Sequence, residues 1–335
     1  MRILVTGAAG FMGSHLVDYL LEKGHQVFGF DNLIWGSVKN INKNSDCHIG
    51  DLRNLTDVNE IFNISKPNLV YHLAAYAAEG QSVFAPRFTT EVNYIGFLNL
   101  ITEVINRDVE TFVFTSSMSV YGPCPTPMLE GWIPDPQDPY AITKTAIEQF
   151  LKIYGPEYGI DYVTLRPHNV YGPRQSLTNP YRNVIGIWMN RIMQGKPPLI
   201  YGNGEQTRAF TYIDDCTPYI ANAAWNSDAH DEIINIGSEQ VLTLNQACEI
   251  VLEAMDSDLK PLYRPERPLE VKHAWCSSNK ARKILGYETK TKFREGIAQM
   301  AEWAKAIGPQ PFVYWPWNQF EIKSDVPKVW SEQEL

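Results

Sequence analysis

The sequence predicts an α/β protein with a Rossmann-like, doubly wound parallel sheet and a smaller mixed α/β domain at its C-terminal end. Short apolar runs alternate with longer helix-period segments over about the first 165 residues. These runs are apolar at nearly every position, as in parallel strands buried on both faces. After about residue 168 the rhythm changes to loops rich in Pro, Gly, Arg and Asn. A chain of 335 residues suits two domains, which we place at 1–167 and 168–335 with some later segments interleaved back onto the first.

Each predicted element follows from its own pattern. The expected strands, in order, read RILVTG, QVFGFD, NLVYHLAA, TFVFTSS and DYVTLRP. Between them lie segments of helical period, such as SHLVDYLLEKG and RFTTEVNYIGFLNLITEVINR, and LNQACEIVLEAM follows in the second domain. Because parallel strands end at one edge of an open sheet, we expect the ligand site in the cleft between that edge and the second domain.

Composition excludes several classes of function. The 29 basic and 38 acidic residues give a net charge of −9, which disfavours nucleic acid as a partner. No apolar stretch is long enough to cross a membrane, and the N-terminus opens directly on a strand, so we expect a cytoplasmic protein. The five cysteines form no CxxC pair, which argues against disulfides and a metal site: Cys47, Cys124, Cys216, Cys248 and Cys276.

A glycine-rich loop follows the first strand. Residues 6–13 read TGAAGFMG, with Gly7, Gly10 and Gly13 between a strand and a helix. This spacing suits a tight turn, close approach of a pyrophosphate to the backbone, and close helix–strand packing. Asp31 ends the next strand, where an acid binds the ribose hydroxyls of NAD and repels the 2′-phosphate of NADP. The alternatives are a purely structural turn and a strand-end cap.

The segment DPYAITK, residues 138–144, predicts the start of a helix. Asp138 suits the N-cap and Pro139 the first helical position, so Tyr140 and Lys144 lie one turn apart on one face. Such a pair is often only a solvated contact. It gains a chemical meaning if Ser117, at the end of the FTSS strand, lies beside it. A phenol acts as a base near neutral pH only when cations stabilise its phenolate.

These motifs together resemble the extended short-chain dehydrogenase/reductase superfamily, and within it the nucleotide-sugar epimerases of the UDP-glucose 4-epimerase type. The resemblance rests on TGAAGFMG, Asp31, HLAA at 72–75, VNYIG, FTSS and the Tyr140–Lys144 pair, and it covers the chain to about residue 300. It implies that Ser117, Tyr140 and Lys144 are catalytic. It also implies that NAD contacts a larger set of residues, to which Tyr140 and Lys144 also belong. These are Gly7, Gly10, Phe11, Met12, Gly13, Asp31, Asn32, Asp51, Leu52, Leu73, Ala74, Ala75, Asn93, Tyr140 and Lys144.

The resemblance extends into the second domain through RPHNVYGPR, YGNGEQTRAFTYIDD and RPERPLEVKHAWCSSNKAR. It implies that Asn169, Arg208 and Arg267 bind the diphosphate of a nucleotide sugar, as guanidinium and amide donors would. The third segment departs from the family pattern at Leu269, Glu270 and Ser277, and Ala77 replaces a lysine of some 4-epimerases. The other expected substrate contacts are Ser117, Tyr140, Val184, Leu199, Tyr201 and Ala274.

Three positions bear on the reaction and on its substrate. Related 4,6-dehydratases carry an acid pair directly after the catalytic hydroxyl, whereas this chain has Met118 and Ser119. The resemblance therefore favours a 4-epimerase acting on a UDP-hexose or UDP-N-acetylhexosamine through a transient 4-keto intermediate. A small residue at Ala274 is expected to admit an N-acetyl group, unless that loop runs differently. UDP-glucuronate 4-epimerase, a nucleotide-sugar reductase or dehydrogenase, and a non-catalytic NAD-binding protein are the alternatives.

Two further expectations concern the assembly. Helices around 88–107 and 139–155 match those that pair subunits in the family, so the resemblance implies a homodimer. The tail from Pro309, with QPFVYWPWNQFEI, is rich in aromatic residues and proline. We expect it to pack on the second domain, with a contact to a partner as the alternative.

Overall fold

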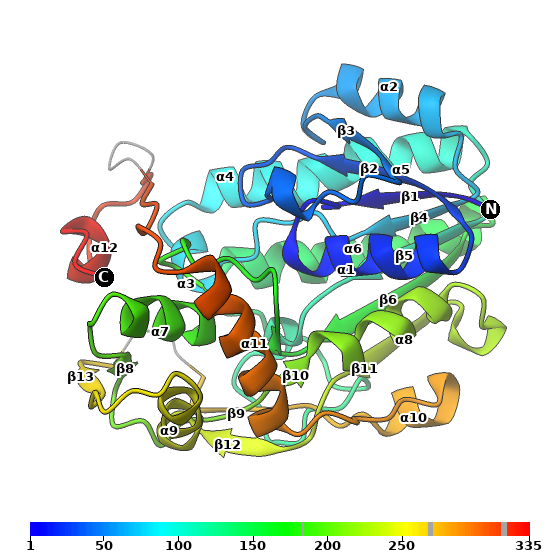
Figure 1. Cartoon of the computed structure of the whole chain (residues 1–335). Coiled ribbons are helices and arrows are strands. Elements are labelled where there is room, and N and C mark those ends of the chain that lie inside the picture. Colours follow the sequence, from blue (N-terminus) through cyan, green and yellow to red (C-terminus); the bar gives the residue numbers. More distant parts are fainter. Residues whose placement is uncertain (183, 267–270, 316–319) are drawn as a thin grey trace.

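The computed structural model describes residues 1–182, 184–266, 271–315 and 320–335 (Figure 1). Its largest element is a sheet of seven parallel strands, in the order β11-β6-β5-β4-β1-β2-β3. The predicted Rossmann-like, doubly wound sheet is therefore confirmed. The strands, in chain order, are β1 (Arg2–Thr6), β2 (Gln26–Asp31), β3 (Asp46–Ile49), β4 (Leu69–His72), β5 (Thr111–Thr115), β6 (Asp161–Pro167) and β11 (Glu232–Ile236).

The order of the strands creates a crevice at one edge of the sheet. The chain starts at β1 in the sheet, continues outward to β2 and β3, and then returns to β4 on the other side of β1. Thr6 pairs with both Phe30 and His72, so the loops after β1, β2 and β4 leave the sheet at one level. Ligands of doubly wound sheets bind at such a reversal, beyond the carboxyl ends of the strands.

Helices cover both faces of this sheet (Figure 1). Three pack through small and branched side chains on one face: α1 (Phe11–Glu22), α8 (Thr217–Ala223) and α10 (Asn279–Leu285). Phe28, Phe112 and Phe114 face the opposite side. There they meet α2 (Leu55–Ser65), α5 (Gly96–Asn106) and α6 (Pro139–Tyr158). Both faces of the central strands β1, β4 and β5 are buried, which explains why these strands are apolar at successive positions.

Helix α6 begins as the sequence predicts. The Asp138 carboxylate accepts a hydrogen bond from the backbone N–H of Ala141 at 2.9 Å, and Pro139 is the first helical residue. Helix α5 is preceded by α4 (Pro86–Thr90) and by a π-helical turn at Glu91–Ile95. The cap fixes where the helix starts, and therefore which of its side chains face the end of β5.

The smaller second lobe is built from short strands and three longer helices around its own apolar core. The helices are α7 (Val184–Met193), α9 (Leu244–Ala254) and α11 (Phe293–Ile307). The strands form three small sheets: β7 (Val170–Tyr171) with β10 (Thr211–Tyr212), β8 (Leu199–Tyr201) with β13 (Leu262–Arg264), and β12 (Val241–Thr243) with β9 (Thr207–Ala209) and β14 (His273–Ala274). The division at residue 167 stays a prediction, and β11 returns to the large sheet beyond it.

The C-terminal tail contacts both parts of the molecule, which extends the expectation that it packs on the second domain. Gln310 is hydrogen-bonded to Asn190 of α7, at 2.9 Å in each direction. Farther on, the Glu321 carboxylate accepts hydrogen bonds from the first backbone N–H groups of α4, at 2.8 and 2.9 Å. The tail ends in α12 (Lys328–Ser331), where Trp330 packs edge-on against Phe84. It therefore links the second lobe to the segment that follows β4.

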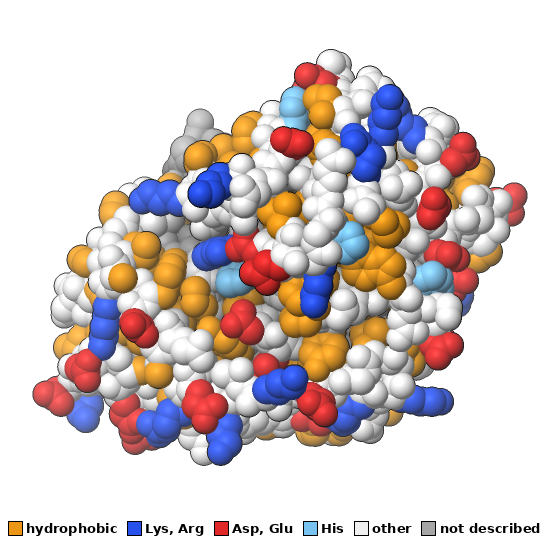
Figure 2. All heavy atoms as spheres, turned by 45° about the vertical axis from the view of Figure 1, so that its right-hand side comes forward, with side chains coloured by type: hydrophobic (Ala, Val, Ile, Leu, Met, Phe, Trp, Pro, Cys, Tyr) orange, Lys and Arg blue, Asp and Glu red, His pale blue; other side chains and the backbone are white. Residues whose placement is uncertain are grey.

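Acidic and basic side chains alternate over the face shown in Figure 2, without a continuous basic stripe. Among the residues that the structure describes, no helix is long and apolar enough to cross a membrane. Within the same residues, no three His, Cys, Asp or Glu side chains gather closely enough to hold a metal ion.

Candidate active site

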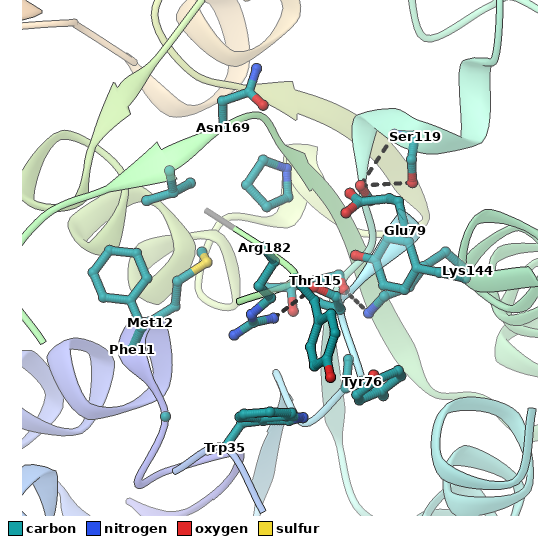
Figure 3. A pocket seen from close by; sticks show the side chains of 18 of the residues that line it. Phe11, Met12, Trp35, Tyr76, Glu79, Thr115, Ser119, Lys144, Asn169 and Arg182 are labelled. Carbon is teal, nitrogen blue, oxygen red and sulfur yellow. Dashed lines mark hydrogen bonds between the residues drawn. The ribbon is translucent and has the colours of Figure 1, made fainter. Parts of the chain in front are cut away.

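A cavity of about 560 Å³ opens at the carboxyl ends of β1, β2, β4 and β5 and reaches the second lobe (Figure 3). It brings together nearly all of the residues predicted from the sequence. From the first lobe these are Gly7, Gly10, Phe11, Met12, Gly13, Asp31, Asn32, Asp51, Leu52, Leu73, Ala74, Ala75, Ser117, Tyr140 and Lys144. From the second lobe they are Asn169, Val184, Leu199, Tyr201, Arg208 and Ala274.

Among the predicted residues that the structure describes, Asn93 is not part of this wall. Asn93 is 1% exposed and lies behind it, where its side chain bonds the backbone N–H and carbonyl of Tyr76 and the Thr143 hydroxyl. It thereby ties the loop after β4 to α6. Arg267 lies outside the described residues, as do Leu269 and Glu270.

The glycine turn at the bottom of the cavity has no room for side chains. Gly7 has φ +73°, and a Cβ there would lie 2.8 Å from the backbone nitrogen of Ala74. A Cβ on Gly13 would lie 2.0 Å from the Gly7 carbonyl oxygen, which explains how α1 packs so closely against the turn. Gly10 is the N-cap of α1, and no side chain caps the helix. The first backbone N–H groups of α1 are thus left for an anion in the cavity.

Asp31 connects this turn to the end of β2. One carboxylate oxygen accepts from the backbone N–H of Ala9 at 3.0 Å, and the other accepts from that of Leu33 at 2.8 Å. Burial raises the pKa of this carboxyl group, while these backbone bonds act in the opposite direction. Asp31 therefore serves as the structural strand-end acid and also lines the cavity.

Ser117, Tyr140 and Lys144 meet at the end of β5. The Ser117 hydroxyl caps the short helical turn at Met118–Tyr121 and accepts a hydrogen bond from the backbone N–H of Ser119 at 3.1 Å. Lys144 Nζ donates to the Thr115 carbonyl at 2.7 Å and lies 5.8 Å from the centroid of the Tyr140 ring. The Tyr140 and Lys144 side chains are buried, with 5% and 2% of each residue exposed. The predicted cluster is thus formed by the fold.

Burial controls the charges of this cluster. It raises the pKa of the Tyr140 phenol, an effect that the negative charge of Glu79 increases and a hydrogen bond with Ser117 opposes. Burial lowers the pKa of Lys144 to about 7, although Glu148 acts to raise it. A phenol in these surroundings needs added positive charge to ionise near neutral pH.

A second polar cluster lies directly behind the first. The Ser116 hydroxyl donates to Glu148 at 2.5 Å, and Glu148 also forms an ion pair with Arg166 at 2.5 Å. The Arg166 guanidinium covers the Tyr121 ring at 4.6 Å, and the Tyr121 hydroxyl donates to Asn235 at 2.7 Å. This cluster is almost wholly buried and ties β5, β6, α6 and β11 together.

The wall of the cavity in the second lobe carries the predicted polar groups. Asn169 adopts a left-handed backbone conformation with φ 45°, and its amide donates to the Ala209 carbonyl at 2.9 Å. The Arg208 guanidinium donates to the carbonyls of Thr207 and Lys272 at 2.8 and 3.1 Å. Ala274 is only 7% exposed, so it faces the interior of the site and is not a surface residue.

Sequence reasoning missed two charged residues of the cavity. Glu79 is the first residue of α3 (Glu79–Ser82), and Arg182 precedes α7. Arg182 donates to the Ala77 carbonyl at 2.9 Å, and its buried Nε has no hydrogen-bond partner among the described residues. Neither residue belongs to a motif used above. An acid directly after the small residues that follow β4 was the only sign of Glu79 in the sequence.

Comparisons with known proteins place these features in a family. Residues 3–237 match the model of the NAD-dependent epimerase/dehydratase family. The chain is 34% identical over 306 residues to a putative UDP-glucose 4-epimerase of Methanocaldococcus jannaschii, covering 90% of this chain and 98% of that protein.

Solved structures give the same result. The UDP-glucose 4-epimerase of Thermotoga maritima, determined with UDP-glucose, is 35% identical with a TM-score of 0.88, covering 92% of this chain and 99% of that one. The UDP-glucuronic acid 4-epimerase of Bacillus cereus, determined with UDP-glucuronic acid and NAD, is 29% identical with a TM-score of 0.84, covering 92% and 100%. The match of the family model, the full-length relatives and the shared fold show that this chain belongs to the NAD-dependent epimerase/dehydratase family.

Proposed function

We propose that the protein is a UDP-sugar 4-epimerase that inverts C4 of a UDP-hexose or UDP-N-acetylhexosamine through a 4-keto intermediate. The observation that supports this most is the Ser117–Tyr140–Lys144 cluster in a cavity of an NAD-dependent family member. Met118 and Ser119 stand where a dehydratase would need acids directly after the serine. Inversion through a ketone requires a single base that takes a proton from the C4 hydroxyl and returns it.

The cavity fits NAD in several ways. The turn leaves no space for a Cβ at Gly7 and Gly13, and the uncapped start of α1 at Gly10 suits a pyrophosphate. Asp31 stands where a 2′-phosphate would meet a carboxylate, which favours NAD over NADP. We therefore assign to cofactor binding the predicted residues that line this half of the cavity, and to Asn93 the role of holding the loop after β4.

The chain's own side chains then have distinct tasks. Tyr140 accepts the proton of the C4 hydroxyl, and Ser117 holds that hydroxyl or passes its proton. Lys144, fixed on the Thr115 carbonyl, supplies positive charge beside the phenol. When bound, NAD supplies the hydride acceptor for C4. Asn169 and Arg208 bind the diphosphate as amide and guanidinium donors, together with Arg267 as the resemblance suggests.

Ala274 supports an N-acetylated substrate, because a small, buried side chain in β14 leaves room inside the cavity. Ala274→Tyr should lower kcat/KM for UDP-N-acetylglucosamine by about tenfold or more relative to that for UDP-glucose, because the phenol ring would fill the space of the acetyl group. Both substrates are compared in wild type and variant by NMR. Unchanged selectivity would contradict the role of Ala274.

A uronic acid is the second candidate substrate, favoured by the Arg182 guanidinium in the cavity. A buried guanidinium that donates only one described hydrogen bond suits a sugar carboxylate. UDP-glucuronate as a third substrate in the same comparison tests this alternative. If UDP-glucuronate is converted fastest, the proposed substrate becomes a UDP-uronic acid, and the proposed reaction at C4 stays the same.

The test of the proposed function is inversion without added cofactor. Purified protein is incubated with each UDP-sugar in turn, and the C4 configuration is followed by NMR. We expect the two C4 epimers to approach equilibrium with no net oxidation. Net oxidation that requires added NAD would support a dehydrogenase, and no reaction with any of the three sugars would contradict the proposal.

We also propose that the protein forms a homodimer through α5 and α6. Several large apolar side chains on these helices and the turn before them are exposed in the single chain: Ile95, Ile142, Ile153 and Tyr158. Such a group of exposed residues suits an interface between subunits. Light scattering at micromolar concentration should give twice the mass of the chain, and a monomer would contradict this assignment.

A further inference from the structure

A carboxylate enters the reaction centre from a segment that the sequence motifs do not cover. Glu79 follows the loop after β4 and lines the cavity together with Ser117 and Tyr140. Figure 3 shows its side chain pointing into the cavity on the side of Ser119 and Lys144, whereas Phe11 and Met12 lie on the opposite side. Glu79 is exposed in the ligand-free chain.

The negative charge of Glu79 acts on groups of the catalytic cluster and its surroundings. Burial is the main cause of the raised pKa of Tyr140, and the charge of Glu79 is the second. The pKa of Asp138 is raised to about 6, mainly by burial and next by the charge of Glu79. Burial lowers the pKa of Arg182, and the charges of Tyr140 and Glu79 oppose that shift. The carboxylate of Glu79, the phenol of Tyr140 and the guanidinium of Arg182 all line the same cavity.

Inversion at C4 gives Glu79 no task, since Tyr140 both takes and returns the only proton that moves. The 4-keto intermediate nevertheless makes a second proton transfer possible. A ketone at C4 acidifies the hydrogens on C3 and C5, because the carbanion formed by their removal is an enolate with its charge on O4. That oxygen would lie beside Ser117 and Tyr140, in the cavity that Glu79 also lines.

We propose that Glu79 is a second acid–base group that removes and returns a proton at a carbon next to C4 of the 4-keto sugar. This inference rests on the proposed function, which supplies the ketone. In the step, the C–H bond breaks, its electron pair moves into the C–C bond and onto O4, and the Glu79 carboxylate gains the proton. Return of a proton to the same carbon restores the ketone, and return to its other face inverts that carbon. No oxidant is consumed.

Arg182 supports this step, because it is bound to the loop after β4 that leads to Glu79. Its guanidinium is fixed on the Ala77 carbonyl, two residues before Glu79, and carries the positive charge that faces both Glu79 and Tyr140. A cation in this place would stabilise the negative charge that develops on O4. The chain thus places a base and a stabilising cation around the sugar in addition to the Tyr140–Lys144 pair.

The experiment uses a ketone that is supplied ready-made, so that it does not depend on hydride transfer. The full-length protein is incubated in D2O with a UDP-linked 4-keto-6-deoxyhexose, and deuterium at C3 and C5 is followed by NMR against a sample without protein. We expect wild type to accelerate exchange at one of the two carbons, by about 10²-fold or more. Glu79→Gln should lose at least nine-tenths of that acceleration.

Glu110→Gln is the matched control, because Glu110 is an exposed carboxylate outside the cavity. This variant should exchange at the wild-type rate, and thermal unfolding should show that both variants are folded. Exchange no faster than in the protein-free sample would overturn the proposal, as would wild-type exchange in Glu79→Gln; the carboxylate would then serve only as an acceptor for a sugar hydroxyl. C4 inversion of UDP-glucose is measured separately, so that exchange of the ready-made ketone without inversion counts against the proposed function alone.

Discussion

Ser116 and Ser117 are neighbours in the sequence, yet they belong to clusters of opposite character. Ser116 donates to Glu148, which pairs with Arg166, and these three residues are only 1–4% exposed. Ser117 faces Tyr140 at the cavity. Tyr140, Lys144 and Glu148 follow one another at single-turn intervals on α6, so one helix face serves both clusters. The difference teaches that the same residue types have a structural role when they form hydrogen bonds and ion pairs with one another. They have a chemical role when a bound ligand must supply the remaining partners.

The largest effect should come from removing the phenolic hydroxyl at the cavity. Tyr140→Phe should lower kcat by about 10²- to 10⁴-fold, because the variant lacks the phenol that we propose as the base for the C4 hydroxyl. Binding of the UDP-sugar, measured by calorimetry, should persist. Tyr121→Phe is the matched variant in the closed cluster, where the hydroxyl bonds Asn235. It should leave kcat unchanged and lower the free energy of unfolding by about 1 kcal/mol. Near-normal turnover of Tyr140→Phe would contradict the catalytic role that separates Tyr140 from Tyr121.

Breaking the buried ion pair should act on stability. Arg166→Met leaves the Glu148 carboxylate buried without its partner, so the free energy of unfolding should fall by about 3–5 kcal/mol in urea titrations. The double variant Glu148→Leu/Arg166→Met should recover most of this loss, because no buried charge remains. A single variant as stable as wild type would show that the closed cluster does not hold these elements together.

Lys144 should make stability depend on pH in a defined direction. Its pKa is lowered to about 7 by burial, from 10.5 in the unfolded chain, so the unfolded protein binds the extra proton between these values. The free energy of unfolding of NAD-free protein should therefore rise with pH through this window. Lys144→Met removes the penalty and should be more stable than wild type by about 2 kcal/mol at pH 6, with a smaller advantage at pH 9. Parallel stability curves for the two proteins would contradict the burial of a charged lysine.

The smallest effects should come from the serine pair itself. Ser116→Ala should lower the free energy of unfolding by about 1.5 kcal/mol, because its bond to the Glu148 carboxylate is lost. Ser117→Ala should leave stability almost unchanged and lower kcat by about tenfold, since water can replace part of its role. Equal effects of the two substitutions on kcat would mean that the clusters are not separate.

The parts that the sequence predicts are those encoded in local pattern. The apolar strands β1, β2, β4, β5 and β6 and the capped start of α6 appear as expected. Strand β3, with the sequence DCHI, escapes prediction because it is short, mixes polar and apolar residues and is partly exposed at the sheet edge. Strand β11 escapes it because the chain first builds part of the second lobe before it returns to the sheet.

The candidate site divides in the same way. The glycine turn, Asp31 and the Tyr140–Lys144 pair each belong to one short segment, so spacing alone indicates them. Glu79 and Arg182 line the same cavity only because α3 and the segment before α7 border it, and no local sequence pattern indicates this. Reasoning from Met118 and Ser119 alone therefore overlooked a carboxylate that another segment supplies.

The central claim is that C4 is inverted by removal and return of its own hydride within one active site. The most direct measurement follows a UDP-sugar carrying deuterium at C4 as purified protein converts it in ordinary water without added cofactor. We predict that the C4 epimer forms with deuterium retained at C4. Loss of the deuterium to solvent during inversion, or formation of the epimer only when external NAD is consumed, would contradict the account.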